Sequence, residues 1–212
     1  MTAKLRLARG KGLYVITDCE KREYRDMLRS TEKILATGIL LLQYRDKSDD
    51  PARRYERAAM LKELCRRTDT IFLINDDIQL AAAIGADGVH IGRDDPPLAA
   101  ARQLLGIDAI IGVSCYNDYQ RARDAQAAGA DYIAFGAFYP TRTKGGTVKA
   151  DPDLLRRARP GLSVPIAAIG GITPANGGQL IEAGADLLAV VSSVYEAGDP
   201  GQVVLKFNAL FQ

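Results

Sequence analysis

The sequence predicts a single-domain (β/α)₈ TIM barrel, and three observations favour this fold. The length, 212 residues, suits one domain near the lower end of the size range for such barrels. Glycine recurs where an alanine-rich helical stretch gives way to an apolar run. Strand-like and helix-like segments alternate until eight strands are counted, which is typical of a closed parallel sheet.

The glycine pattern is the clearest internal repeat. It reads ATGILLLQYR at Gly38, AIGADGVHIG at Gly85, AAGADYIAFG at Gly129 and EAGADLLAVVSS at Gly184. Each glycine stands where a helix needs a left-handed C-cap, and each apolar run is typical of a strand buried on both faces. The spacing is roughly two strand–helix units, so another strand is expected between successive repeats.

The eight expected strands form one uninterrupted series. They are Gly12–Asp18, Ile39–Lys47, Thr70–Asp76, Gly88–Gly92, Ile110–Ser114, Tyr132–Gly136, Val164–Gly171 and Leu187–Ser192. Helical stretches between them include Pro51–Arg67, Asn117–Ala128 and Thr173–Ala183. An open doubly wound sheet is the alternative, but no GxGxxG follows the first strand and a count of eight favours closure. No linker interrupts the series, so residues 1–212 are expected to form one domain.

Composition excludes several classes of protein. Lysine and arginine number 28 and acidic residues 26, which gives no expectation of a nucleic-acid or membrane partner. No apolar run approaches the roughly 20 residues that span a bilayer, and the start of the chain does not resemble a secretory signal. Three separated cysteines argue against a disulfide framework, so we expect a cytoplasmic protein. Residues 1–11 read as a basic, solvated N-terminal extension with no assigned role.

Polar residues gather at the ends of the expected strands, where barrels of this type build their sites. Gln43, Arg45 and Lys47 alternate and should face one way. A solvated edge strand would alternate too, but the continuous apolar run Leu40–Leu42 favours an inward cationic cluster. Such a cluster is costly without an anion, and a phosphate or diphosphate relieves that cost.

Two carboxylates fall at neighbouring strand ends. Asp76, with Asn75 before it, and Asp95 could simply cap the helices that follow. Together, however, Asp76 and Asp95 suit Mg²⁺, which prefers a few protein oxygens plus substrate phosphates. His90 is the one histidine of the chain, and a packed, hydrogen-bonded role is favoured over a catalytic one.

The last strands suggest a second anion site. The loop after the sixth strand carries Thr141, Thr143 and Lys144 beside two glycines, as expected of a lid that closes over an anion. Backbone amides near Gly171 and Ser192 match the phosphate site common in this fold, although tight packing could also explain the glycine. Two anion sites predict two small phosphorylated substrates, or one substrate with phosphates at both ends.

These segments, taken together, resemble the thiamine phosphate synthase family. The resemblance rests on YVITD, LLQYRDK, FLINDD, GADGVHIGRDD, IIGVS, PTRTK, AAIGGITPAN and GADLLAVVSS, and it covers nearly the whole chain. It implies a transferase that uses Mg²⁺ to couple a hydroxymethylpyrimidine diphosphate to a thiazole phosphate, which releases pyrophosphate. The implied chemistry is dissociative, because pyrophosphate leaves before the thiazole nitrogen attacks.

The resemblance also implies residue roles. The pyrimidine diphosphate would be held by Gln43, Arg45, Lys47, Asn75, Ser114 and Lys144, of which Arg45, Ser114 and Lys144 would act in catalysis. Mg²⁺ would be bound by Asp76 and Asp95, and the thiazole phosphate by Thr141, Thr143, Gly171, Val191 and Ser192. The chain departs from the family at Cys115–Tyr116 and in the segment GGTVKAD that follows Lys144.

Two alternatives remain beside the synthase. A thiazole tautomerase-like isomerase would share the barrel, but its catalytic histidine would match the position of Tyr116, and its diphosphate set is typically eroded. A non-catalytic thiamine-precursor sensor is the other, although a sensor needs no metal pair beside a leaving group. A homo-oligomer is compatible with every reading.

Overall fold

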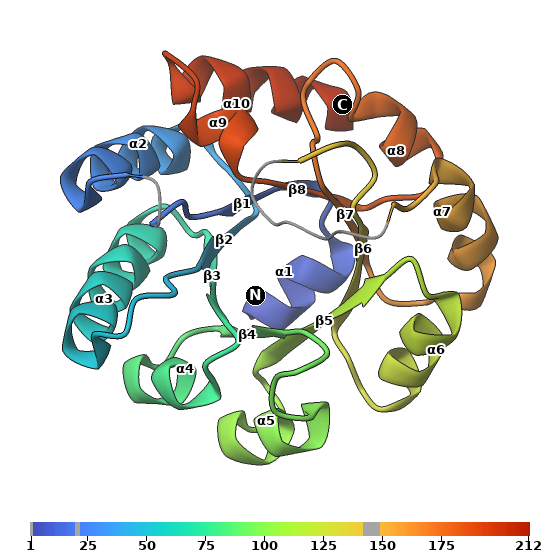
Figure 1. Cartoon of the computed structure of the whole chain (residues 1–212), viewed down its shortest axis with the longest axis horizontal. Coiled ribbons are helices and arrows are strands. Elements are labelled where there is room, and N and C mark those ends of the chain that lie inside the picture. The colour runs from blue at the N-terminus through green and yellow to red at the C-terminus, as the bar shows by residue number, and fades with distance from the viewer. Residues whose placement is uncertain (1, 20–21, 142–148) are drawn as a thin grey trace.

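A computed structural model describes residues 2–19, 22–141 and 149–212. Across these residues, eight parallel strands pair in chain order and close into a barrel, because β8 pairs with β1 (Figure 1). The predicted (β/α)₈ fold, in a single domain, is therefore confirmed. The strands are β1 Gly12–Ile16, β2 Leu41–Tyr44, β3 Ile71–Asn75, β4 Gly88–Ile91, β5 Ile110–Tyr116, β6 Tyr132–Gly136, β7 Ile166–Ile169 and β8 Leu187–Val190.

Helices surround the barrel and follow the strands (Figure 1). They are α1 Ala3–Arg9, α2 Tyr24–Thr37, α3 Pro51–Arg67, α4 Ile78–Ile84, α5 Leu98–Leu105, α6 Tyr119–Ala127, α7 Pro152–Ala158, α8 Gly178–Glu182, α9 Ser192–Tyr195 and α10 Pro200–Asn208, with 3₁₀ turns η1 Arg159–Gly161 and η2 Ala209–Phe211. No helix in the described ranges is long and apolar enough to cross a membrane.

The core has two layers, as the alternation of side chains along buried strands requires. Residues such as Val15, Phe72 and Ile111 point outward and pack under the helices. Residues such as Leu41, Ile71 and Leu187 fill the barrel interior, which is therefore packed rather than hollow.

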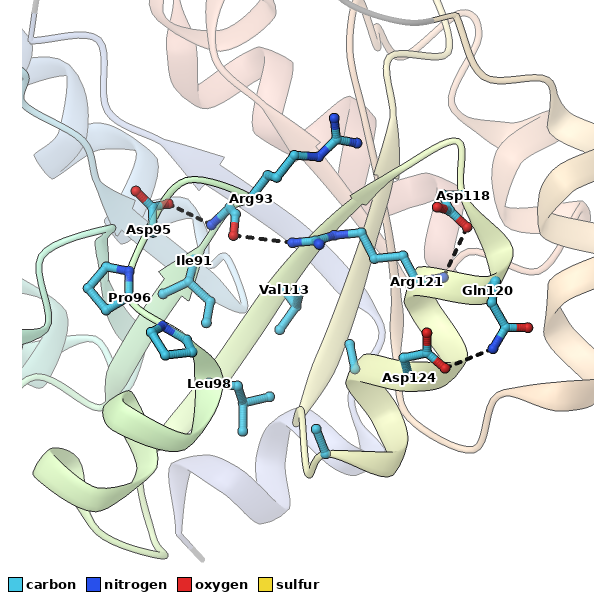
Figure 2. A pocket seen from close by; sticks show the side chains of 14 residues that line it. Ile91, Arg93, Asp95, Pro96, Leu98, Val113, Asp118, Gln120, Arg121 and Asp124 are labelled. Carbon is cyan, nitrogen blue, oxygen red and sulfur yellow. Dashed lines mark hydrogen bonds between the residues drawn. The ribbon is translucent and has the colours of Figure 1, made fainter.

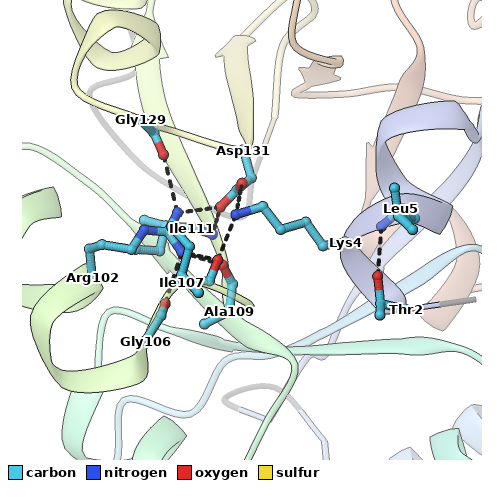
Figure 3. Close-up of polar contacts among 10 residues, drawn as sticks. All are labelled: Thr2, Lys4, Leu5, Arg102, Gly106, Ile107, Ala109, Ile111, Gly129 and Asp131. Atoms are coloured by element: carbon cyan, nitrogen blue, oxygen red, sulfur yellow. Dashed lines mark hydrogen bonds and ion pairs between the residues drawn. The ribbon is translucent and has the colours of Figure 1, made fainter.

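The expectation of a solvated basic tail is wrong. Ala3–Arg9 forms helix α1, which lies across one end of the barrel (Figure 1). Leu7 is 1% exposed and packs with the interior residues, while Lys4 makes an ion pair with Asp131 at 2.8 Å (Figure 3). Asp131 directly precedes β6, so α1 closes the end of the barrel at which the strands begin. The apolar stripe of this helix, rather than its charge, decides where it lies.

The aspartates of the repeated Gly-Ala-Asp motif fasten that same end. Asp87, Asp131 and Asp186 precede β4, β6 and β8. Each accepts a hydrogen bond from the backbone N–H at the start of the preceding strand, at 2.8 Å, 2.8 Å and 2.9 Å respectively. The glycines before them adopt positive φ as expected, for example +63° at Gly85, which forms the left-handed C-cap of α4. The three residues of this motif therefore end a helix and join two neighbouring strands.

Two of the predicted strands are longer than the strands observed. The second strand was expected over Ile39–Lys47 and the seventh over Val164–Gly171, but β2 and β7 are shorter at both ends. Polar and glycine residues after the apolar run have left the sheet and belong to the loops. Arg45, Lys47 and Gly171 are consequently loop residues, set just beyond the barrel.

Candidate active site

The predicted site residues that the structure describes lie at or just after the carboxyl ends of seven of the strands, at the end of the barrel opposite α1. Gln43 lies within β2, near its end, and is 1% exposed. Arg45 follows β2 and is held by Thr17, whose Oγ1 accepts from the Arg45 backbone N–H at 2.9 Å and donates to its carbonyl at 3.2 Å. Thr17, itself buried, thus fixes the point at which the chain leaves the barrel.

Lys47 joins two of the predicted groups. Its ammonium forms an ion pair with the Asp76 carboxylate, which also accepts a hydrogen bond from Asn75 Nδ2 at 2.6 Å. Asp76 has a positive φ of 65°, and its backbone N–H donates to the His90 carbonyl at 2.8 Å. Such a backbone conformation is uncommon for a non-glycine residue.

The helix-cap interpretation of these residues is wrong. Asp77 caps α4, since its Oδ1 accepts from Leu80 N at 2.9 Å. Helix α5 has no side-chain cap, and Asp95 instead accepts from the Gly92 backbone N–H at 2.6 Å. Asp76 is therefore held by Lys47 and Asn75, and Asp95 by Gly92, and neither carboxylate caps a helix.

Asp76 and Asp95 are close enough for each to shift the pKa of the other. Burial raises the pKa of Asp95, and the neighbouring Asp76 raises it further. Burial would also raise the pKa of Asp76, but the hydrogen bonds with Asp95 and Lys47 outweigh this effect and hold it below its usual range. Two carboxylates this close repel one another unless a proton or a cation lies between them.

This donor set fits Mg²⁺. The part of the chain that the structure describes contains no cluster of three His, Cys, Asp or Glu side chains, so no all-protein metal cage is present there. Magnesium is usually bound by one or two carboxylates, with waters and substrate phosphates completing its coordination. The Asp76–Asp95 pair supplies such a partial set, and a divalent cation would remove the repulsion that raises the pKa of Asp95.

His90 is packed and hydrogen-bonded, as predicted. Its Nδ1 lies 2.8 Å from the Tyr132 hydroxyl and its Nε2 lies 2.8 Å from Ser114 Oγ. Ser114, which the sequence assigned to the pyrimidine, is half-buried near the end of β5. The histidine therefore contacts the expected binding site through Ser114.

The second predicted anion site lies after β7 and β8. Gly171, with φ +60°, is packed tightly, because a Cβ there would approach the Pro140 carbonyl oxygen to 2.4 Å. Asn176 holds this turn: its Nδ2 donates to the Gly171 carbonyl at 3.1 Å and its Oδ1 accepts from Thr173 N at 2.8 Å. Packing against the loop after β6 is thus sufficient to require glycine at this position.

The remaining predicted residues surround this turn. Val191 directly follows β8, and Ser192 begins the short helix α9. Thr141 is half-buried at the end of a described range. Thr143 and Lys144 lie outside the described residues.

A cavity of about 540 Å³ lies behind the rim, between α5 and α6 (Figure 2). Arg121 from α6 forms part of its wall and donates to the Ser114 carbonyl at 2.9 Å and to the Gly92 carbonyl at 3.2 Å. Asp95 lies at the edge of this cavity. The predicted site residues other than Asp95 do not line it, so it supports the rim from outside rather than forming the barrel mouth.

Sequence reasoning missed the residues that hold the site in place. Thr17, Asn176 and Arg121 each bind backbone at a strand end. Tyr14 and Tyr132 lie inside the barrel and form hydrogen bonds to Gln43 and His90. A tyrosine in an apolar strand resembles any core aromatic, yet its buried hydroxyl needs a partner, and that need is the signal that could have identified both.

A closed parallel barrel with carboxylates, cations and hydroxyl groups at the carboxyl ends of its strands defines the class of (β/α)₈-barrel enzymes. Within that class, a family model described as thiamine monophosphate synthase matches residues 13–194. The chain belongs to this family, which confirms the resemblance stated from the sequence and the expectation of a transferase.

Individual relatives agree with the family model. The chain is 53% identical to the thiamine-phosphate synthase of Azoarcus sp. (strain BH72) over 201 residues, which are 95% of this chain and 97% of the relative. It is 47% identical to that of Thioalkalivibrio sulfidiphilus, covering 95% and 96% of the two chains. The solved structure of thiamine phosphate pyrophosphorylase from Pyrococcus furiosus is similar with a TM-score of 0.84 and 31% identity, over 97% of this chain and 96% of that chain. These relatives carry the synthase name and give no support to the isomerase or sensor alternatives.

Proposed function

We propose that this chain is a thiamine phosphate synthase that couples 4-amino-2-methyl-5-hydroxymethylpyrimidine diphosphate to a thiazole phosphate. The observation that carries the proposal is the Asp76–Asp95 carboxylate pair with Lys47 bound to Asp76, on the same rim of the barrel as Gln43 and Ser114. Carboxylates and a cation suit a metal-bound diphosphate, and the amide and hydroxyl suit a polar ring. Membership of the synthase family supports the same assignment.

Diphosphate binding is assigned to one side of the rim. Arg45, Lys47 and Asn75 follow β2 and β3, next to the carboxylate pair. Lys144 is assigned to the same substrate from the sequence alone. The thiazole phosphate is assigned to the opposite side, where Gly171, Val191 and Ser192 follow β7 and β8, with Thr141 and Thr143 from the loop after β6.

Asp76 and Asp95 would hold Mg²⁺, which when bound would supply positive charge to the pyrophosphate leaving group. Arg45 and Lys47 place further positive charge beside that group. The C–O bond between the pyrimidine methylene and the diphosphate breaks first, and its electron pair leaves with pyrophosphate. The thiazole nitrogen then donates its lone pair to the methylene carbon and forms the C–N bond. No proton is transferred in this sequence, which agrees with a site whose one histidine is packed.

The setting proposed is the cytoplasm. Cys19, Cys65 and Cys115 are all free thiols, as expected in a reducing compartment. The proposal is compatible with a monomer and with a homo-oligomer.

The test is a coupling assay with purified protein, both substrates and Mg²⁺. We expect thiamine phosphate and pyrophosphate in equal amounts, no product when either substrate is omitted, and no product after chelation by EDTA. Isomerisation of the thiazole without coupling would establish the tautomerase instead. Tight binding of both compounds without any turnover would establish the sensor.

A further inference from the structure

The loop that carries the cations of the proposed diphosphate site is anchored from outside the barrel. Tyr44 ends β2 and packs in the outer layer of the core. Asp46 lies on the same side of the chain and pairs with Arg57 of α3 at 3.1 Å. Lys47, the next residue, faces the opposite way and pairs with Asp76. The alternation of the strand therefore continues past its end, with one side directed to the site and the other to α3.

Asp46 is a carboxylate in a position where burial is unfavourable. Its side chain is 3% exposed, so its charge is costly unless donors surround it. Oδ2 accepts from Arg57 Nη1 at 3.1 Å and from the Tyr44 hydroxyl at 2.9 Å, and Oδ1 accepts from the Ser48 backbone N–H at 2.9 Å. Burial would raise the pKa of Asp46, but the hydrogen bonds from Ser48, Tyr44 and Arg57 hold it below its usual range. Asp46 is thus kept as an anion by its neighbours.

The hydrogen bond from Ser48 closes a turn around Lys47. It joins the Asp46 side chain to the backbone beyond Lys47, so the backbone of the lysine is fixed within the turn. On the other side, Thr17 Oγ1 binds both the N–H and the carbonyl of Arg45. The two cations assigned to the diphosphate are therefore presented by a short segment that is held at both ends.

Helix α3 makes a second contact of this kind, with the loop after β3. Arg54, one turn before Arg57 and on the same face of the helix, pairs with Asp77 at 3.2 Å. Asp77 directly follows Asp76 and also caps α4. Arg57 is itself held, because its guanidinium lies 4.4 Å from the centre of the Tyr24 ring of α2. One face of α3 therefore holds a neighbour of each member of the ion pair in the site.

We propose that α3 positions the Lys47–Asp76 pair for the metal-bound diphosphate, through the two carboxylates that its arginines bind. Arg57 and Arg54 are accordingly positioning residues, and neither is assigned to contact substrate. A loop that is ordered before the anion arrives does not have to be ordered at the expense of binding, so these contacts should appear as affinity. The inference rests on the proposed function, since it concerns the diphosphate half of that reaction.

Magnesium pyrophosphate is the direct probe, because it reports on the diphosphate site without turnover. Arg57→Leu removes the cation and leaves the Asp46 carboxylate buried without it. We expect the affinity for pyrophosphate in Mg²⁺, measured by titration calorimetry, to fall about tenfold, the scale of one charge-assisted hydrogen bond. In steady-state kinetics, KM for the pyrimidine diphosphate should rise by a similar factor, and KM for the thiazole phosphate should not change.

The matched control is Arg159→Leu. Arg159 pairs with Asp186 at 2.7 Å, and Asp186 also accepts a backbone N–H, from Ile166 at 2.9 Å. The contact resembles that of Arg57 with Asp46, but it lies at the end of the barrel where the strands begin. We expect this variant to lose stability in thermal denaturation, with no change in pyrophosphate affinity or in either KM.

The outcomes separate the inference from the proposed function. If wild-type protein binds magnesium pyrophosphate but couples no substrates, the proposed function is wrong, and the binding data alone decide the inference. If Arg57→Leu binds pyrophosphate as tightly as the wild type, or loses no more affinity than Arg159→Leu, α3 does not position the site. An equal rise in both KM values would also contradict the inference.

A second variant covers the case in which Arg57→Leu fails to fold. Arg54→Leu acts on a more exposed contact, since the Asp77 side chain is 26% exposed, and it leaves the cap of α4 in place. We expect a smaller loss of pyrophosphate affinity than for Arg57→Leu. An affinity equal to that of the wild type would overturn the inference.

Discussion

The two ends of this barrel are built from the same residue types for opposite purposes. At the end where the strands begin, Asp131 is satisfied within the protein: it binds Lys4 at 2.8 Å, Arg102 at 2.6 Å and the Ile111 backbone N–H at 2.8 Å (Figure 3). At the other end, Asp76 and Asp95 lie against each other, with pKa values displaced in opposite directions.

The difference teaches how to separate a structural carboxylate from a functional one. A carboxylate that ties two segments together has cations and backbone N–H groups around it. Two carboxylates placed next to each other repel, and a bound cation relieves that repulsion. Helix α1 covers the end of the barrel where the strands begin. At the other end, the described residues that follow the strands form loops, and barrel enzymes place their active sites at this end.

The largest expected effect comes from breaking the proposed metal-binding pair. Asp76→Ala should lower kcat/KM by about 10³-fold or more, on the scale of losing electrostatic stabilisation of the transition state. Its melting temperature should stay close to that of the wild type, since removing one of two facing carboxylates also removes repulsion. Steady-state kinetics across a Mg²⁺ titration, with thermal denaturation alongside, measure both. Activity that survives both this change and EDTA would show that the metal assignment is wrong.

The structural carboxylate should behave in the reverse manner. Asp131→Ala leaves Lys4 and Arg102 without their shared partner, and its side chain is only 10% exposed. Losing these partly buried contacts, together with the hydrogen bond from the Ile111 backbone N–H, should cost about 1–3 kcal/mol of unfolding free energy. Denaturant unfolding should show this loss, while kcat and KM of the remaining folded enzyme stay unchanged. A catalytic defect with normal stability would contradict the division between the two ends.

Lys144 tests the lid predicted from the sequence. Lys144→Ala should lower kcat by about 10²–10³-fold, because a cation that meets charge developing on the leaving group acts in the transition state. Diphosphate affinity should change much less. Lys144→Arg should recover only part, since a planar guanidinium does not reproduce a compact ammonium. An unchanged kcat at saturating substrates would show that Lys144 is a solvated loop residue with no catalytic role.

The smallest effect compares two glycines with positive φ. Gly171→Ala should raise KM for the thiazole phosphate more than for the diphosphate, because the new Cβ would displace Pro140 and the loop that leads to Thr141. Gly129→Ala is the control: its φ is +92°, but nothing lies within 4 Å of the added Cβ. That change should cost roughly 1–2 kcal/mol of stability through backbone strain and leave both KM values alone. Equal effects on the two substrates at Gly171 would contradict separate pockets.

Much of the fold could be predicted because burial leaves a strong pattern. All eight strands coincide with predicted apolar runs, and Pro51–Arg67 matches α3 at both ends. Charge misled the prediction for α1, since its three basic side chains obscured the buried Leu7. The helix predicted over Thr173–Ala183 is shorter, as α8 covers Gly178–Glu182, because Thr173 and Asn176 form a turn instead.

The site was harder to predict, since sequence indicates which residues share a rim but not which of them touch. Gln43, Asn75, Asp76 and Ser114 lie at strand ends as expected, yet the ion pair between Lys47 and Asp76 follows from loop conformation. Tyr14 and Tyr132 come from strands far apart in the chain, so nothing local connects them. Only the folded barrel brings their hydroxyl groups together.

The central claim, that the chemistry belongs to the rim held by Asp76 and Asp95, is tested most directly by a crystal structure with the pyrimidine diphosphate and Mg²⁺. We expect the metal on both carboxylates, the diphosphate beside Arg45 and Lys47, and the ring between Gln43 and Ser114. Substrate bound in the cavity between α5 and α6 (Figure 2), or a diphosphate with no metal on Asp76 and Asp95, would contradict the account.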